Sequence, residues 1–285
     1  MARTVYVNGT YVPETQACVS VFDRGFLFAD AIYEVCTVLN GKLIDTAGHL
    51  ARLNRSLKEL QMNHPCSDEA MLRILHTLQE ENNLQEGLIY LQVSRTGKDR
   101  GFAWDADSPT SVVAFTQAKA LIDAPEAKHG IRVITLPDLR WQRRDIKTTN
   151  LLYACMAKVA SRDAGADDAW LVENGSITEG TSNNAYIVTE DNTIVTHKLG
   201  HDILAGCTRA SLLALAKEEG LSIEERSFSE AEIDSAREAF VTSASTFCWP
   251  VVKVNDKPVG DGKPGPLALR LRELYIKAAL ERMAD

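Results

Sequence analysis

The alternation of apolar and polar residues predicts several β-hairpins. Residues 5–12 alternate around Asn8-Gly9, and residues 33–45 turn at Asn40-Gly41. An Asn-Gly pair favours a two-residue hairpin turn, because both positions tolerate positive φ. A longer hairpin region is predicted over 168–197, with turns at Asn174-Gly175 and Asp191-Asn192. Further strands are predicted over 87–95, 111–117, 130–136, 222–228, 238–244 and 251–254.

Apolar residues at helical spacing predict two helices early in the chain. Thr46 is expected to cap a helix that runs to about Met62, and Ser67 to cap the next. Their apolar stripes are Leu50, Leu53, Leu57 and Leu60, then Met71, Ile74, Leu75 and Leu78. Later helices are predicted over about 150–164, from Cys207 or Thr208 to Glu219, and from 267 to about 283.

The order of these elements predicts two domains. Residues 1–117 combine hairpins, helices and further strands, which indicates an α+β layer rather than a strict βαβ repeat. Residues 118–130 lack clear periodicity and are interpreted as a linker. Residues 131–285 then form a second domain of strands and helices.

The composition excludes several classes of function. With 45% hydrophobic and 25% charged residues, the chain is typical of a soluble globular protein. Its net charge of −8 argues against nucleic-acid binding. The six cysteines form no Cys-x-x-Cys pair, the six histidines show no metal-ligand spacing, and no segment is apolar enough for a signal peptide or a membrane span. We therefore expect a cytoplasmic protein with reduced thiols, no metal site and no membrane partner.

Residues 260–265 match the pattern G-x-G-x-x-G of dinucleotide-binding folds. That pattern has its meaning only between a strand and a helix of a βαβ unit. Here the segment lies near the C-terminus, contains Pro264 and is followed by Pro266. We interpret it as a turn-rich loop before the last helix. The alternative, a nicotinamide-dependent oxidoreductase, depends on this loop alone.

Lys147, in the segment 144–152, and Glu179, in the segment 177–184, are the candidate chemical groups. A lysine that forms an imine and a carboxylate that holds a pyridinium proton are the minimum for pyridoxal phosphate chemistry. Burial or nearby cations such as Arg143 and Arg144 lower a lysine pKa and favour the free amine. Taken singly, the first segment is typical of an exposed charge cluster and the second of a turn.

An anion site is predicted where 205–209 precede a helix, because free amides at a helix N-terminus attract phosphate. Thr208 adds a hydroxyl, and Ser243, at the end of an apolar strand, is placed to complete the site. The alternative is a glycine loop with a threonine cap. Arg52 lies on the helix from Thr46, and its spacing alone gives it no role.

Five ordered blocks together resemble the fold-type IV pyridoxal-phosphate enzymes, and most closely the D-amino acid transaminases. The similarity extends over almost the whole chain. The blocks are Asp-Arg-Gly-Phe-Leu-Phe-Ala-Asp-Ala-Ile-Tyr-Glu (23–34), Gly-His-Leu-Ala-Arg-Leu (48–53), Arg-Trp-Gln-Arg-Arg-Asp-Ile-Lys (140–147), Thr-Glu-Gly-Thr-Ser-Asn-Asn (178–184) and Leu-Ala-Gly-Cys-Thr-Arg (204–209).

The resemblance implies a role for each block. Lys147 would carry pyridoxal 5'-phosphate as a Schiff base and later shuttle the substrate proton. Glu179 would pair with the pyridinium nitrogen, and Ser182 would lie close to the ring. The remaining residues would hold the phosphate: Arg52, Cys207, Thr208, Ser243 and the backbone of Ala244, whose side chain lacks the hydroxyl that the family often has there.

On the substrate side, the D-enzymes use a tyrosine and an Arg-x-His pair to bind the substrate carboxylate. Tyr33 matches the tyrosine, Arg100 the arginine, and Phe102 stands at the histidine position. Because phenylalanine cannot donate a hydrogen bond, we expect weaker carboxylate binding. Loss of one charge-assisted bond costs about 1.5–3 kcal/mol. Such a loss favours apolar substrates or amines that have no carboxylate.

The resemblance implies a two-domain fold-type IV enzyme, with an N-terminal α+β domain and a C-terminal β-barrel-like domain flanked by helices. It implies a homodimer and ping-pong transamination between a D-alanine-like donor and 2-oxoglutarate or pyruvate. The alternatives are an (R)-selective amine transaminase, which Phe102 favours, a branched-chain L-amino acid transaminase, an aminodeoxychorismate lyase, and a non-catalytic binding protein of the same fold.

Overall fold

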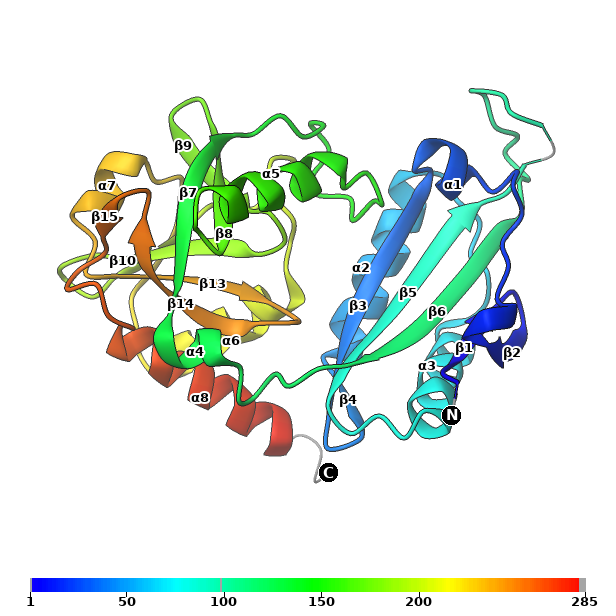
Figure 1. Cartoon of the computed structure of the whole chain (residues 1–285), viewed down its shortest axis with the longest axis horizontal. Coiled ribbons are helices and arrows are strands. Elements are labelled where there is room, and N and C mark those ends of the chain that lie inside the picture. The colour runs from blue at the N-terminus through cyan, green and yellow to red at the C-terminus, as the bar shows by residue number, and fades with distance from the viewer. Residues whose placement is uncertain (1, 98, 282–285) are drawn as a thin grey trace. The chain divides into compact units, whose positions relative to one another are not determined.

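The computed structural model describes residues 2–97 and 99–281, which divide into two compact units (Figure 1). The first unit contains the residues up to Ala120 and the segment Ile146–Asn150, and the second contains Leu121–Asp145 and the residues from Leu151 onward. The chain thus passes from the first unit to the second inside the range 118–130, and returns for five residues around Lys147.

The first unit is built on a six-stranded antiparallel sheet with the order β2-β1-β6-β5-β3-β4. Both predicted hairpins are confirmed. Asn8 and Gly9 have φ of 47° and 95°, and Asn40 and Gly41 have φ of 47° and 71°. The strands are β1 (Thr4–Val7), β2 (Thr10–Pro13), β3 (Ala31–Leu39), β4 (Lys42–Ile44), β5 (Gly87–Arg95) and β6 (Thr110–Ala118).

Two long helices of this unit agree with the predicted apolar stripes. They are α2 (Thr46–Glu59) and α3 (Asp68–Glu81), and Ser67 caps α3 by accepting a hydrogen bond from the amide of Ala70. The predicted cap of α2 is wrong: Asp45, in the left-handed region, precedes the helix, which already begins at Thr46. The sequence did not predict two short helices, η1 (Glu14–Gln16) and α1 (Arg24–Phe28).

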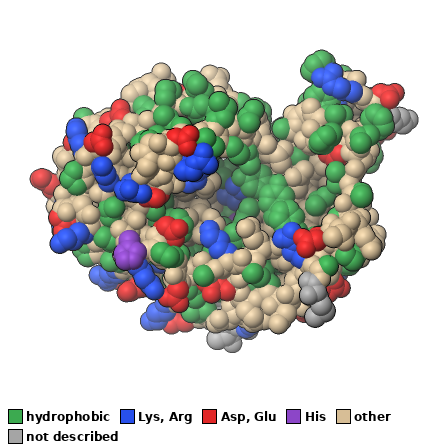
Figure 2. Space-filling model, viewed as in Figure 1, with side chains coloured by type: hydrophobic (Ala, Val, Ile, Leu, Met, Phe, Trp, Pro, Cys, Tyr) green, Lys and Arg blue, Asp and Glu red, His purple; other side chains and the backbone are tan. Residues whose placement is uncertain are grey.

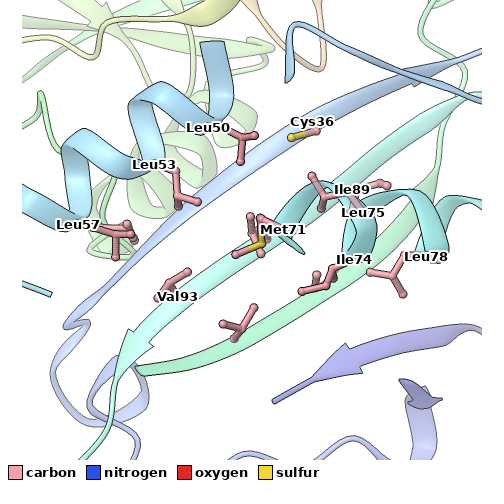
Figure 3. Close-up of a cluster of buried hydrophobic side chains, with 14 of the residues drawn as sticks. Cys36, Leu50, Leu53, Leu57, Met71, Ile74, Leu75, Leu78, Ile89 and Val93 are labelled. Atoms are coloured by element: carbon pink, nitrogen blue, oxygen red, sulfur yellow. The ribbon is translucent and has the colours of Figure 1, made fainter. Parts of the chain in front are cut away.

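The core of the first unit lies between these helices and the sheet. Figure 3 shows side chains of α2 and α3 directed toward residues of β3 and β5. A cluster of buried apolar side chains of this size supplies the main stabilisation of such a layer, because each fully buried side chain contributes about 1.5–3 kcal/mol. The labelled members are Cys36, Leu50, Leu53, Leu57, Met71, Ile74, Leu75, Leu78, Ile89 and Val93.

The second unit is built on a nine-stranded mixed sheet with the order β12-β11-β10-β13-β14-β7-β8-β9, and β15 pairs with β14. Its pairs β7–β8, β7–β14 and β11–β12 are parallel. The strands are β7 (Ile131–Pro137), β8 (Asp168–Glu173), β9 (Ser176–Gly180), β10 (Asn184–Val188), β11 (Ile194–Thr196), β12 (Ile223–Glu225), β13 (Glu238–Ser243), β14 (Phe247–Val254) and β15 (Lys257–Pro258).

Alternating residues of β10 send side chains into two different cores. Ala185 and Ile187 belong to one buried cluster, and Tyr186 and Val188 to another that α6 and α8 cover. A strand that is buried on both faces is apolar throughout, as β10 is after its first residue. The helices of this unit are α4 (Pro125–His129), α5 (Leu152–Asp163), α6 (Cys207–Glu218), α7 (Glu230–Asp234) and α8 (Pro266–Glu281). The predicted end of the last helix near 283 lies outside the described residues.

The segment 260–265 is a turn, as interpreted from the sequence. Gly260 and Gly262 have φ of 56° and 77°. The carboxylate of Glu238 accepts hydrogen bonds from the amides of Leu267 at 3.1 Å and Ala268 at 3.0 Å. A protein carboxylate therefore occupies the N-terminus of α8, the place where a dinucleotide fold would bind phosphate.

The surface carries charges of both signs. On the face shown in Figure 2, acidic and basic side chains lie interspersed with apolar ones. Within the ranges 2–97 and 99–281, none of the helices has the length and apolar character that a membrane span requires.

Candidate active site

Lys147 is held against the first residues of β3. Because β4 pairs only with Thr37–Leu39, the start of β3 has an open side. The segment 146–150 pairs there. The amide of Tyr33 donates to the carbonyl of Lys147 at 2.9 Å, and Ile32 forms an isolated bridge with Thr148. The sequence thus places the lysine on a strand-like segment that the sheet fixes.

The side chain of Lys147 lies over an aromatic ring. Its Nζ is 4.3 Å from the ring centroid of Tyr33, which stacks on Tyr90, and Tyr90 stacks on Phe115. Burial raises the pKa of the Tyr90 phenol, and the neighbouring Tyr33 adds to that rise. The structure therefore brings together two residues, Lys147 and Tyr33, that the sequence assigned to the cofactor and the substrate separately.

Arg52 is bound by a buried carboxylate. Its Nε donates to Oε1 of Glu34 at 2.9 Å, and its terminal nitrogen donates to Oε2 at 2.6 Å. His49, one helical turn earlier on α2, places Nδ1 2.7 Å from the same Oε2. Burial acts to raise the pKa of Glu34, but the charges and hydrogen bonds of Arg52 and His49 lower it to about 2. Glu34 is therefore an anion that holds the Arg52 guanidinium in a fixed orientation.

In the second unit, Glu179 lies near the end of β9, where its side chain is buried and accepts three hydrogen bonds. Arg140 donates to Oε1 at 2.7 Å. The side chain of Asn184 and the amide of Leu204 donate to Oε2 at 3.1 and 3.0 Å. Burial raises the pKa of the Glu179 carboxyl, and the Arg140 charge opposes the rise. Three donors leave one acceptor position on Oε1, since a carboxylate has about four.

A buried ionic network lies behind Glu179. Arg140 also donates to Oδ2 of Asp138 at 2.7 Å, and Thr178 donates to the same oxygen at 2.7 Å. Burial acts to lower the pKa of Arg140, but Asp138 and Glu179 raise it above its ordinary value. The Arg140 guanidinium is therefore held beside Glu179 by protein groups alone.

The N-terminus of α6 has the features of an anion site. Its cap residue, Gly206, makes no side-chain capping bond, so the first amides of the helix, including those of Cys207 and Thr208, are not bound by a cap side chain. Thr208 is buried and Cys207 half-buried. The alternative of a threonine cap does not hold, because Thr208 lies inside the helix.

Hydroxyl groups gather in the turn between β13 and β14. Oγ of Ser243 lies 3.2 Å from Oγ of Ser245 and 2.9 Å from Oγ1 of Thr246. Ala244 lies between them in sequence and has no hydroxyl to add. Thr242, one residue before Ser243, is the register partner of Asn184 on β10. Since Asn184 also contacts Glu179 and Leu204, the candidate residues of the second unit meet at this end of β10.

Ser182 is exposed in the turn between β9 and β10. The residues on either side hold this turn to a buried carboxylate. Thr181 donates to Oδ1 of Asp168 at 2.6 Å, and Asn183 donates to Oδ2 at 2.7 Å. Asp168 therefore fixes the backbone that carries Ser182.

Arg100 and Phe102 lie in the segment between β5 and β6, which projects past the end of the sheet in Figure 1. The Arg100 guanidinium is 5.1 Å from the Phe28 centroid and 5.4 Å from that of Phe102. Phe102 is 78% exposed. Arg24, which is buried, donates to the carbonyls of Gly101 at 2.6 Å and Phe102 at 3.1 Å. The backbone of this segment is thus held, while its side chains face outward.

Comparison with known proteins identifies the family. The model of the family "Amino-transferase class IV" matches residues 31–254. D-alanine aminotransferase from Bacillus licheniformis is 36% identical over 282 residues, covering 98% of each chain. The enzyme of the same name from Staphylococcus haemolyticus is 34% identical over 96% of each chain. The chain belongs to the class IV aminotransferases.

Solved structures of branched-chain aminotransferases share the whole fold. A branched-chain amino acid aminotransferase from T.th., solved with pyridoxamine 5'-phosphate, superposes with a TM-score of 0.90, at 26% identity, over 99% of this chain and 95% of that one. The Escherichia coli branched-chain enzyme also gives 0.90, at 22% identity, over 98% and 95%. The predicted resemblance to fold-type IV, and the predicted fold class, are confirmed.

The sequence did not identify the partners of the candidate residues Arg52 and Glu179. Glu34 and His49 around Arg52, and Arg140 and Asn184 around Glu179, were not predicted. A signal existed in part: His49 and Arg52 are three residues apart on a helix, so they share a face. Arg140 and Glu179 are 39 residues apart, and no local pattern connects them.

Proposed function

We propose that this class IV aminotransferase transfers an amino group from a D-amino acid, such as D-alanine or a relative, to 2-oxoglutarate or pyruvate in a ping-pong reaction. The observation that carries the proposal is the 36% identity, over 98% of each chain, to a D-alanine aminotransferase. Branched-chain enzymes share the fold at 22–26% identity and support the alternative substrate class less well. Pyridoxal 5'-phosphate is the cofactor.

The described residues fit this cofactor. Glu179 retains one acceptor position on Oε1, which suits the hydrogen of a protonated pyridine nitrogen. The uncapped amides at the start of α6 suit a phosphate dianion. Arg52 and Ser243 add a cation and a hydroxyl. Lys147 supplies the amine that a carbonyl cofactor requires.

In the proposed mechanism, Lys147 would hold the cofactor through its amine. Its free amine would then move a proton between the substrate Cα and C4′ of the cofactor, acting first as a general base and then as a general acid. When bound, the cofactor supplies an electron sink for the substrate carbon. Glu179, which is paired with Arg140, would accept the hydrogen bond from the pyridine nitrogen and so support that chemistry.

The phosphate group is assigned to five residues. The backbone amides of Cys207 and Thr208, the Thr208 hydroxyl, the Ser243 hydroxyl and the Arg52 guanidinium would hold it, with the backbone of Ala244 beside them. Since Glu34 fixes the Arg52 guanidinium through two of its nitrogens, the arginine is preorganised for one orientation. Ser182 is assigned to the edge of the ring.

On the substrate side, Tyr33 and Arg100 are assigned to the α-carboxylate. Tyr33 is placed beside the Lys147 amine, which supports this role. Phe102 cannot donate a hydrogen bond, so Arg100 has to bind the carboxylate without that neighbour. This observation favours a second candidate, an (R)-selective amine transaminase, in which Phe102 contacts an apolar substituent.

We further propose a homodimer in the cytoplasm. One helix of the second unit supports an interface, because α5 exposes large apolar side chains at helical spacing. They are Leu152, Met156 and Val159, which are 73%, 59% and 46% exposed. The scattered cysteines, free in the structure, support a reducing compartment. Sedimentation of the purified protein measures its mass in solution and so tests whether it is a dimer.

Borohydride reduction and a lysine variant test the proposal. We expect reduction of the cofactor-bound protein to fix the cofactor covalently on Lys147, as mass spectrometry of its peptide would show. Lys147→Ala should lose at least about 10²–10⁴-fold in turnover, the usual contribution of proton transfer. Lys128→Ala, at an exposed lysine of the second unit that pairs with the exposed Asp123, is the control. A cofactor adduct on another lysine, or steady turnover by Lys147→Ala, would remove Lys147 from its role.

A further inference from the structure

Asn184 lies at the junction between the two candidate ends of the cofactor site. Its side chain is buried, and its amide nitrogen donates to Oε2 of Glu179 at 3.1 Å and to the carbonyl of Leu204 at 2.9 Å. The amide of Leu204 donates back to Oε2 of Glu179 at 3.0 Å. Glu179, Asn184 and Leu204 therefore form a closed triangle of hydrogen bonds, in which both amide hydrogens of Asn184 are used.

The other face of the Asn184 amide packs against the cap of α6. A Cβ built on Gly206 would come within 2.3 Å of Oδ1 of Asn184. Gly206 has φ of −67°, a conformation open to any residue, so close approach rather than backbone strain requires the glycine. The Asn184 amide therefore contacts both Glu179 and the cap of α6, in addition to the direct bond from the Leu204 amide to Glu179.

The backbone of Asn184 adds a third connection. Asn184 is the register partner of Thr242, the residue before Ser243. One residue therefore joins Glu179, the cap residue of α6 and the strand that carries the Ser243 hydroxyl. An alanine at this position would keep the strand pairing and lose the other two connections.

We propose that Asn184 is a positioning residue that fixes the separation between Glu179 and the N-terminus of α6. On the proposed function, these are the groups for the pyridine nitrogen and the phosphate, and the inference rests on that function. A rigid cofactor gains its full affinity only when both ends meet their partners together, because binding energy is lost when the protein has to reorganise.

Asn183 provides a matched control in the same turn. It is also buried and also donates one short hydrogen bond, at 2.7 Å, but to Asp168. Asp168 keeps bonds from Thr181 and the amide of Ala169 when Asn183 is removed. Asn183→Ala therefore removes a buried side chain of the same size next to Asn184 without releasing Glu179 from α6.

The experiment compares affinities for pyridoxal 5'-phosphate and for pyridoxal, which lacks the phosphate, by equilibrium binding to the apoprotein. The dissociation constant for pyridoxal divided by that for pyridoxal 5'-phosphate reports how far phosphate binding assists ring binding. We expect Asn184→Ala to reduce this ratio about tenfold, and Asn183→Ala to leave it within about twofold. Urea unfolding of both variants reports any general loss of stability separately.

Gly206→Ala tests the same contact from the other side. Its Cβ would push α6 away from Asn184, so we expect a similar fall in the ratio. In the double variant with Asn184→Ala the clash is removed, and the second change should cost at least about threefold less than it does alone. The single variant Gly206→Ala still tests the contact if Asn184→Ala folds poorly.

The outcomes separate the inference from the proposed function. If the wild-type protein forms no covalent complex with pyridoxal phosphate, the proposed function fails. The wild type can bind pyridoxal phosphate while Asn184→Ala and Gly206→Ala weaken the binding of both ligands by the same factor. In that case Asn184 has only a structural role, and the inference is overturned. An unchanged ratio in both variants overturns it as well.

Discussion

The residues assigned to the cofactor and those assigned to the substrate have different surroundings. Glu179 is buried and receives three hydrogen bonds, and Arg52 is bound by a buried glutamate. Arg100 and Phe102, in contrast, lie on a projecting segment, where their exposed side chains contact each other and the ring of Phe28 while Arg24 binds the backbone. The first set is fixed by the fold, and the second is open to change.

This difference follows from what each set has to recognise. A cofactor is the same in every turnover, so buried polar networks that are fully satisfied are suited to hold it. Substrates differ among relatives that share a fold, and loops tolerate the substitutions that this requires. Changes among the buried residues should therefore affect both stability and activity, whereas changes on the segment should affect substrate preference alone.

Glu179→Gln tests the buried side with the largest expected effect. A glutamine has one acceptor oxygen, so it cannot serve Arg140, Asn184 and the amide of Leu204 together with a cofactor. We expect turnover to fall about 10²–10³-fold, as for loss of one preorganised electrostatic partner. Steady-state kinetics measures the change. Glu173→Gln is the control, since Glu173 is also paired with an arginine but is one-third exposed. Equal effects of the two changes would contradict the assignment.

The pH dependence of stability tests the Glu34 network. The pKa of Glu34 is about 2 in the folded protein against 4.5 ordinarily, since Arg52 and His49 outweigh the effect of burial. Its folded-state pKa is lower, so its contribution is present above pH 4.5 and is lost as pH falls from about 4.5 toward about 2. The difference corresponds to about 3 kcal/mol.

Urea unfolding of the apoprotein between about pH 6 and pH 3 measures this contribution. Glu34→Gln should be less stable at neutral pH and should show a shallower loss on acidification than the wild type. Glu14→Gln removes an exposed pair with Arg3 and is the control, with no expected change in slope. Parallel acid profiles for wild type and Glu34→Gln would show that the network does not hold Glu34 ionised.

Phe102→His tests the exposed side, with the smallest expected effect. An imidazole restores a donor beside Arg100, so kcat/KM for D-alanine should rise about tenfold, the lower end for a charge-assisted bond. The value for (R)-1-phenylethylamine should not rise, and urea unfolding should be unchanged. Phe26→His, at another exposed phenylalanine of the first unit, is the control. A fall for both substrates would mean that Phe102 has a packing role instead.

Local patterns predicted most elements of the fold. Asn-Gly pairs specified hairpins because they adopt positive φ, and Ser67 capped its helix as expected. The α2 cap was wrong because Asp45 adopts a left-handed conformation, and its side chain makes no capping bond. Helix α1 was not predicted, since five residues show no periodicity. Its cap, Asp23, accepts from the amides of Gly25 and Phe26 and was the available signal.

The site was predictable only in its contacting groups. Lys147 and Glu179 were proposed because an amine and a carboxylate together suit one cofactor, the resemblance supplied Arg52, and these assignments stay predictions. The partners that fix them come from distant segments, as with Arg140 and Asn184, and depend on sheet register and burial. Such contacts depend on tertiary packing, and they cannot be predicted from the spacing of residues along the chain.

The visible spectrum of the purified protein with pyridoxal phosphate, before and after addition of D-alanine, is the most direct test of D-amino acid transamination by this protein. L-leucine and (R)-1-phenylethylamine are added to parallel samples. We expect D-alanine to replace the absorption band of the lysine-bound cofactor with that of its pyridoxamine form, and a 2-oxo acid to restore the first band. Conversion by L-leucine or the amine alone would contradict the D-amino acid assignment, and absence of any cofactor band would contradict the account as a whole.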